Sequence, residues 1–256
     1  MKIRPFKLDT LRGFVLPLAL LVWWELESHR DAAHTYTFVP LEAVASAGVD
    51  ALRSGDLFSN WWASLLRTSA GLLVGSALGL SLGALMNFSR WVNALAGPLY
   101  HAIRQVPLLG WIPLISLWFG NGEYSKFLVI AMAAFYPTTL NTYEGLRNVE
   151  EKYLAVAQVL KLSRWQQFCH VTFPHSLPSV FAGLLQATAF AWLSSIGGEF
   201  FFNPGPGLGT MMVNAQTNMR TEVVMVTVIA ITLTGFAMNA LLFRLSRYTL
   251  QWRSTT

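Results

Sequence analysis

The sequence predicts an all-α integral membrane protein with about six transmembrane helices. Hydrophobic residues make up 54% of the 256 residues and charged residues only 12%, which is about half the charged share of a typical soluble domain. Several apolar stretches approach the roughly 20 residues that a helix needs to cross the hydrocarbon core of a bilayer. A soluble protein with an unusually apolar core has no need of stretches of that length.

The candidate spans, in chain order, lie at about residues 13–26, 61–86, 98–119, 126–141, 177–200 and 223–243. The first is short, contains Pro17 and follows a basic start, so it resembles a signal peptide. Because further spans follow it, we expect a transmembrane helix instead. The third span is broken by Pro107 and Pro113.

The second span carries a glycine at every fourth position, namely at Gly71, Gly75, Gly79 and Gly83. In a helix this spacing places the glycines on one face, where the lack of side chains lets another helix approach closely. Membrane helices are generally rich in glycine, but a strict run of this kind favours a packed interior helix.

The positive charges indicate the orientation of the chain. If the N-terminus is cytoplasmic, twelve Lys and Arg residues lie in inside segments and four in outside segments. The inside set is Lys2, Arg4, Lys7, Arg12, Arg90, Arg147, Lys152, Lys161, Arg164, Arg244, Arg247 and Arg253, and the outside set is Arg30, Arg53, Lys126 and Arg220. Short cytoplasmic loops are enriched in Lys and Arg, so both termini should be cytoplasmic. The net charge of +5 is then an orientation signal and does not indicate a nucleic-acid surface.

These assignments divide the chain into a cytoplasmic tail at 1–12, a transmembrane domain at 13–243 and a second cytoplasmic tail at 244–256. A cytoplasmic loop at about 144–176 interrupts the transmembrane domain. Cys169 is the only cysteine, which excludes an intrachain disulfide and a cysteine metal cluster. The five histidines form no pair at the spacing of ligands on one helix, so we expect no metal site.

The loop between the fourth and fifth spans is too long for a simple connection. Its spacing of apolar residues predicts one helix at 150–162 and a second at 164–171, with Ser163 capping the second. Pro174 and Pro178 should stop the second helix and open the next span. The exposed aromatic and basic side chains suit docking into the groove of a partner protein. They suit an amphipathic hairpin on lipid headgroups equally well.

This loop resembles the cytoplasmic EAA loop of ABC-importer permeases. The resemblance rests on KLSRWQQFCHVTFPHSLPSVFAGL (161–184) and the residues before it. Without gaps, Ala155, Val156 and Ala157 stand at the E-A-A positions, Lys161 stands at the glycine, and Val171, Phe173 and Pro174 stand at I-x-L-P. IRQVPLLGWIPLISLWFGNGEYSKF (103–127) and PGPGLGTMMVNA (204–215) resemble permeases for aliphatic sulfonates, nitrate and taurine. The similarity covers about residues 60–245. It departs from the pattern at Ala155, where the family has glutamate, and at Lys161, where a glycine normally permits a sharp turn.

The resemblance implies the fold of a type I ABC-importer permease in the cell inner membrane. Two copies of the chain would form the translocation path, two cytoplasmic ATPase subunits would dock on the loops, and a periplasmic or lipid-anchored binding protein would deliver the substrate. That substrate would be a small anion such as a sulfonate, taurine or nitrate. The chain lacks a G-x-x-x-x-G-K-[ST] loop, so it is expected to hold no cofactor, and ATP and Mg would sit at the partner ATPase. The ATPase-coupling residues that the resemblance implies are Ala155, Ala157, Lys161, Ser163, Arg164, Trp165 and Phe168.

Four polar residues near span ends are candidates for the translocation path: Arg67, Arg104, Gln105 and Glu199. Ionisable groups in spans are often functional, and a positive charge in a cavity would suit an anion. The alternative for the two arginines is snorkelling to the interface or structural pairing. For Glu199 the alternatives are an outer gate, a contact for the delivering protein or an ordinary interfacial carboxylate.

Two other classes of protein compete with an importer subunit. An integral-membrane enzyme is disfavoured because the sequence contains no G-x-S-x-G elbow and no His–carboxylate pairing at membrane depth. A stand-alone secondary transporter or channel usually has inverted repeats and polar residues at the bilayer midplane. The middle of each span here is nearly all apolar. Co-purification with an ATPase would distinguish an importer subunit from both.

Overall fold

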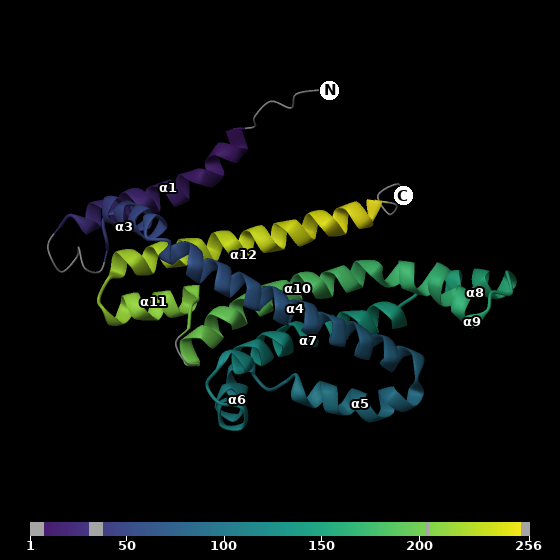
Figure 1. Cartoon of the computed structure of the whole chain (residues 1–256). Helices are drawn as coiled ribbons and strands as arrows, with labels where there is room; N and C mark the ends of the chain where they lie inside the picture. The colour runs from purple at the N-terminus through teal and green to yellow at the C-terminus, as the bar shows by residue number, and fades with distance from the viewer. Residues whose placement is uncertain (1–7, 31–37, 203–204, 252–256) are drawn as a thin grey trace. The chain divides into compact units, whose positions relative to one another are not determined.

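The computed structural model describes residues 8–30, 38–202 and 205–251, and within these ranges it contains helices and no strand. This confirms the all-α class. The helices, traced in Figure 1, are α1 (Leu8–Ser28), α3 (Leu41–Arg53), α4 (Asp56–Phe88), α5 (Arg90–Ile103), the 3-10 helix η1 (Leu108–Trp111), α6 (Ile112–Phe119), α7 (Glu123–Arg147), α8 (Glu151–Val159), α9 (Arg164–Gln167), the π-helix η2 (Phe168–Thr172), α10 (Phe173–Phe201), α11 (Leu208–Thr217) and α12 (Thr221–Thr249).

The chain forms two compact units, each assembled from two separate segments. The first consists of Met1–Phe58 and Met211–Ile229, and the second of Ser59–Thr210 and Ala230–Thr256. In the first unit, α3 packs against the end of α11 and the start of α12. Its core comprises Val39, Val44, Ala47, Ala215, Val223 and Val226.

Among the residues that the structure describes, three helical segments are long and apolar enough to cross a membrane: α4, the continuous stretch Arg164–Phe201, and α12. A fourth span results if α5 and the η1–α6 segment count as one broken span. They meet at a bend of 94°, where Pro107 lacks an amide hydrogen and precedes η1. The first and fourth predicted spans lie in α1 and α7, which do not meet this test. The total of six spans therefore stays a prediction.

The glycine face of α4 packs directly on α7. All four glycines are buried. A Cβ atom added at Gly71 would lie 2.5 Å from Ile130 Cγ2, and one added at Gly79 would lie 2.9 Å from the carbonyl oxygen of Phe135. No side chain fits in these gaps, so the backbones of the two helices lie in contact. The predicted close helix packing is confirmed, and its partner is α7.

Helix α7 is the centre of the second unit. It also packs along α10, which lies beside it in Figure 1 and runs in the opposite direction. The buried core between these helices is small and apolar, with Ile130, Ala134, Ala187 and Ala191 fully covered. Because neighbouring helices shield α7, it tolerates the buried hydroxyl groups of Thr138 and Thr139, which bond back to carbonyl oxygens of their own helix.

Candidate functional site

A cavity of about 740 Å³ opens in the second unit between α5, α7 and α10. Most of its lining is apolar, including Leu109, Phe190 and Phe200. Two residues that the sequence placed in the translocation path, Arg104 and Gln105, line it as well. They lie just beyond the C-terminal end of α5, where that helix gives way to the turn before η1.

The polar groups of this cavity include one cation. Within the described part of the chain, no carboxylate forms an ion pair with Arg104. On another wall, Gln186 accepts a hydrogen bond from Asn141 Nδ2 (3.3 Å) through its amide oxygen, and Gln186 lines the cavity too. An apolar cavity with few polar groups and one cation can accommodate a small anion that carries a hydrocarbon part.

Arg67 and Glu199 lie elsewhere, in a charged network at the facing ends of α4, α7 and α10. The guanidinium of Arg67 lies 2.5 Å from Glu199 Oε1 and 2.7 Å from Glu123 Oε2. Lys126 Nζ lies 2.9 Å from Glu123 Oε1. The side chain of Glu199 is 0% exposed and that of Arg67 is 7% exposed. The positive charge of Arg67 is therefore matched by carboxylates, in contrast to Arg104.

The same network fixes the chain that follows α10. Glu199 Oε2 accepts a hydrogen bond from the amide of Gly209 (2.6 Å), and Ser64 Oγ accepts one from the amide of Leu208 (2.9 Å). Arg67 Nη2 donates to the carbonyl oxygen of Pro206 (3.1 Å). A buried carboxylate thus holds the first turn of α11, where backbone amides lack partners within the helix.

Sequence reasoning missed two members of this network. Glu123 and Lys126 lie three residues apart at the start of α7, which is the spacing of an ion pair on one helix face. That spacing was visible in the sequence and could have identified them. Their meeting with Arg67 and Glu199 depends on how three separate helices pack.

The predicted coupling loop comprises α8, α9 and η2. The first predicted helix is present but shorter, at Glu151–Val159. Ala157 is buried, and the side chain of Ala155 is exposed. Glu150 lies directly before α8, and its carboxylate is 2.5 Å from Nζ of Lys152 in the first turn. The hydrogen bond between them raises the pKa of Lys152.

Lys161 takes the backbone conformation that the family's glycine would take. Its φ is 50°, in the left-handed region that favours glycine. Two residues later, Ser163 begins α9 with a capping box: its hydroxyl accepts from the amide of Gln166, and the side chain of Gln166 accepts from the amide of Ser163. The sharp turn between the two helices therefore forms without glycine.

The rings of Trp165 and Phe168 lie 5.7 Å apart, but the two side chains differ in exposure. Trp165 is 71% exposed, and Arg164 beside it is also exposed. Phe168 packs against Phe88 at the end of α4, with ring centroids 4.7 Å apart, and against Phe173 at 5.7 Å. The exposed pair is available to a partner, whereas Phe168 connects the loop to the helices behind it.

The expectation that Pro174 and Pro178 stop the second loop helix is wrong. Helical structure continues from Arg164 to Phe201 without a break. Pro174 falls in the first turn of α10, directly after the π-helical turn of η2. A wider turn changes which amides must bond to which carbonyl oxygens, so the missing amide of the proline interrupts nothing. The loop helix is thus continuous with α10.

Comparisons with known proteins agree with this architecture. Residues 72–253 match the family described as "Binding-protein-dependent transport system inner membrane component". The chain is 30% identical to SsuC of Bacillus subtilis (strain 168), named as an aliphatic sulfonates transport permease, over 96% of this chain and 88% of the relative. It is 28% identical to the taurine transport system permease protein TauC of Escherichia coli (strain K12), over 95% of this chain and 90% of the relative.

A solved structure has the same fold. The crystal structure of an amino acid ABC transporter with histidines contains a chain that superposes with a TM-score of 0.65, covering 78% of this chain and 97% of that one. The two sequences are 17% identical, so the likeness concerns the fold.

Proposed function

Because the chain belongs to the family of binding-protein-dependent transport system inner membrane components, we propose that it forms the translocation path of an ATP-driven importer for a small anion such as a sulfonate, taurine or nitrate. Members of this family are transport subunits and not enzymes. The multi-pass inner-membrane location follows from the same membership and from the apolar helices.

The observation that carries the anion assignment is Arg104. It is the cation that lines the cavity between α5, α7 and α10, whereas Arg67 and Lys126 are matched by carboxylates. A guanidinium presents several N–H donors in a plane that matches the oxygens of a sulfonate or nitrate. The apolar wall beside it would cover the hydrocarbon part of a sulfonate.

The path would also need a link to the ATPase. In this proposal Arg164 and Trp165 are the contacts that a cytoplasmic ATPase grips, because both are exposed on a short helix that continues into α10. A push on α9 would pass along α10 to the cavity wall that carries Gln186 and Phe190. Movement of packed helices as rigid elements is an established route for switching access.

The remaining partners follow from membership of the family and from the charge pattern. We propose a second copy of the chain, two ATPase subunits that hold ATP and Mg, a binding protein outside the membrane, and surrounding lipid. The termini would lie in the cytoplasm, as the tails 1–12 and 244–256, with the transmembrane domain between them. The loop at 144–176 would then face the ATPase.

Uptake of radiolabelled taurine and of a labelled alkanesulfonate tests the proposal. The chain is reconstituted in liposomes with the ATPase and binding protein that co-purify with it. Uptake should require ATP, and Arg104→Gln should lower it about tenfold or more, since loss of a charge-assisted contact is worth about 1.5–3 kcal/mol. Arg104→Lys should retain part of it. The matched control is Arg90→Gln, because Arg90 is exposed and lies outside the cavity.

Two outcomes would contradict the proposal. Uptake that survives complete ATP depletion would favour a stand-alone transporter or channel. Full uptake by Arg104→Gln would remove the anion assignment while leaving the importer assignment intact.

A further inference from the structure

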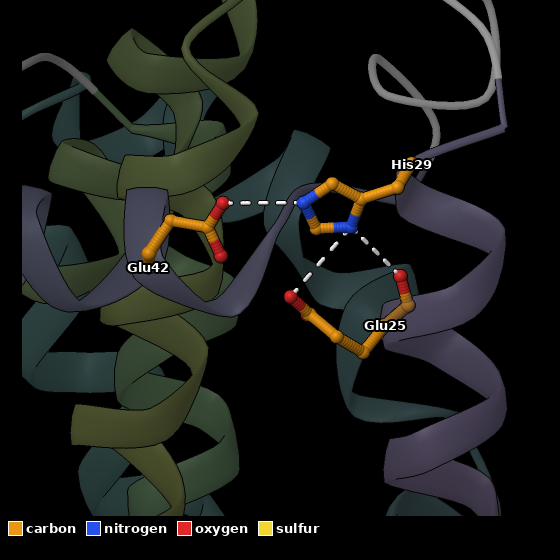
Figure 2. Close-up of side chains that lie close together, drawn as sticks. All are labelled: Glu25, His29 and Glu42. Atoms are coloured by element: carbon orange, nitrogen blue, oxygen red, sulfur yellow. Dashed lines mark hydrogen bonds and ion pairs between the residues drawn. The ribbon is translucent and has the colours of Figure 1, made fainter.

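A cluster of three potential metal ligands lies in the first unit. Figure 2 shows the carboxylates of Glu25 and Glu42 pointing toward the imidazole ring of His29. Glu25 and His29 lie one turn apart on α1 and just beyond its end, and Glu42 lies in the first turn of α3. One ligand atom from each residue lies within 4.8 Å of the other two.

Each ring nitrogen of His29 lies near a carboxylate: Nδ1 is 3.7 Å from Glu25 Oε1, and Nε2 faces Glu42. His29 Nδ1 lies 3.0 Å from the carbonyl oxygen of Glu25, which can only accept, so Nδ1 carries the hydrogen in this bond. In a neutral ring Nε2 then has a lone pair, and it lies 3.3 Å from Glu42 Oε1. Two acceptors at this distance repel each other unless a positive charge lies between them.

The spacing of Nε2 and Glu42 Oε1 suits a metal ion between them, and a turn of the Glu25 carboxylate, which now lies 3.7 Å from Nδ1, would bring in the third ligand. Zinc binds histidine nitrogen and carboxylate oxygen at about 2.0–2.2 Å with tetrahedral angles, which places neighbouring ligand atoms about 3.3 Å apart. The distance from Nε2 to Glu42 Oε1 has this value already. A histidine that binds metal through one nitrogen usually donates its other N–H to a carbonyl or carboxylate oxygen, as Nδ1 does here.

Contacts outside the cluster hold its two halves together. Glu25 Oε2 accepts a hydrogen bond from the amide of Leu41 (3.0 Å). Trp24 Nε1 donates to the carbonyl oxygen of Val39 (2.9 Å), and the ring of Trp24 packs edge-on against Phe38 with centroids 5.0 Å apart. These bonds tie the end of α1 to the start of α3, so the three ligands are brought together without an ion.

We propose that Glu25, His29 and Glu42 form a binding site for a divalent transition-metal ion of the zinc type, which cross-links α1 to α3. One imidazole and two carboxylates leave a fourth tetrahedral position for water. The imidazole favours zinc over magnesium and calcium, which prefer sites built only of oxygen. Arg30 does not compete for the carboxylates of the site, because it pairs with Glu27 at 3.1 Å.

A proton is the competing occupant of this position. The hydrogen bond to the Glu25 carbonyl, followed by the charges of Glu42 and Glu25, raises the pKa of His29. The metal must displace that proton, so zinc should bind more tightly as the pH rises. The spacing of the histidines predicted no metal site, because it concerns only pairs of histidines on one helix. In this cluster two of the three ligands are carboxylates, and one of them comes from another helix.

Isothermal titration with zinc chloride tests the site. The full chain is purified in detergent, freed of its affinity tag and stripped with a chelator. The wild-type chain should show a site that His29→Ala and Glu42→Gln each weaken by about tenfold or more, since even indirect disturbance of a metal site costs 10–100-fold. The matched control for Glu42→Gln is Asp50→Asn, which removes one exposed carboxylate from the same helix and should leave the site unchanged.

Thermal unfolding supplies a second readout. Zinc should raise the Tm of the wild-type chain and of Asp50→Asn more than that of His29→Ala, because an ion bound only to the folded state stabilises it. His29 is largely exposed, so the variant without zinc should unfold like the wild type. Equal zinc affinity in the wild type and His29→Ala overturns the site. Magnesium chloride that binds as tightly as zinc chloride overturns its assignment to a transition metal.

Discussion

The backbone amide of Leu162 donates a hydrogen bond to the carbonyl oxygen of Ala157 at 3.1 Å, and this bond closes α8. The amide of Lys161 donates to the carbonyl oxygen of Gln158 at 2.9 Å. These two bonds, with a left-handed residue between the helix and the outgoing chain, form the motif that commonly ends helices with glycine. Lys161 holds the left-handed position with a φ of 50°.

Lys161→Gly should therefore stabilise the loop locally. A non-glycine residue in the left-handed region costs about 1–2 kcal/mol, and the added chain entropy of glycine offsets part of that gain. We expect a net effect of about 0.5–1 kcal/mol, seen as slower hydrogen–deuterium exchange of the Leu162 amide. Lys152→Gly is the control: Lys152 lies inside α8, and glycine there should cost about 1 kcal/mol and speed exchange. Faster exchange in Lys161→Gly would contradict this account.

Gly79→Ala should destabilise the helix pair α4–α7. The new methyl group would lie 2.9 Å from the Phe135 carbonyl oxygen and from Thr138 Cβ, and neither can move away without shifting a helix. Overpacking of this kind costs about 1–3 kcal/mol. Denaturation in detergent, followed by circular dichroism, measures the loss. Gly48→Ala is the control, since its methyl group would meet Val226 Cγ2 at an ordinary 3.6 Å and should be neutral or stabilising.

Glu199→Gln should be among the most destabilising single substitutions. It leaves Arg67 half-paired in a buried position, and removing one partner of a buried ion pair costs about 3–5 kcal/mol. The double variant Arg67→Gln/Glu199→Gln should lose less than the sum of the two single losses, which a double-mutant cycle measures. Glu222→Gln, which breaks a more exposed pair with Arg220, should change stability by no more than about 1 kcal/mol. Strict additivity of the Arg67 and Glu199 losses would show that the two charges do not interact.

Trp165→Ala combined with Arg164→Glu should prevent the ATPase from docking while leaving the chain in the membrane. Large aromatic and arginine side chains often supply most of the energy of an interface, so a loss of at least tenfold in pull-down of the ATPase is expected. Trp91→Ala is the control, because Trp91 is 77% exposed but lies outside the loop. Normal assembly of the complex with both substitutions in place would rule out this docking role.

Periodic and compositional features of the chain could be predicted well from sequence. Long apolar stretches marked α4, α10 and α12, and the spacing of Gly71 and Gly79 predicted a helix face that packs closely. Ser163 was correctly assigned as the cap of a short helix. Each of these features depends on residues close together in the chain, where the helical repeat fixes their relation.

Features set by tertiary packing were not predictable in the same way. Helix α3 lies in a stretch expected to be an outer loop, because its apolar face is short and is covered by α11 and α12. The partners of Arg67 come from α7 and α10, and nothing local to Arg67 identifies them. The effect of Pro174 was misjudged because the π-helical turn before it has no distinctive sequence pattern.

The shielded position of α7 has a consequence for how the chain enters the bilayer. This helix carries hydroxyl, amide and charged side chains and falls short of the apolar content at which α4 or α12 would partition unaided. Its insertion should therefore depend on packing against neighbouring helices. Helix α4 is synthesised first and presents its glycine face to α7, and α10 is synthesised later and covers another face of α7. Substitutions that block the glycine face of α4 should therefore cause proteolysis of newly made protein before they affect transport.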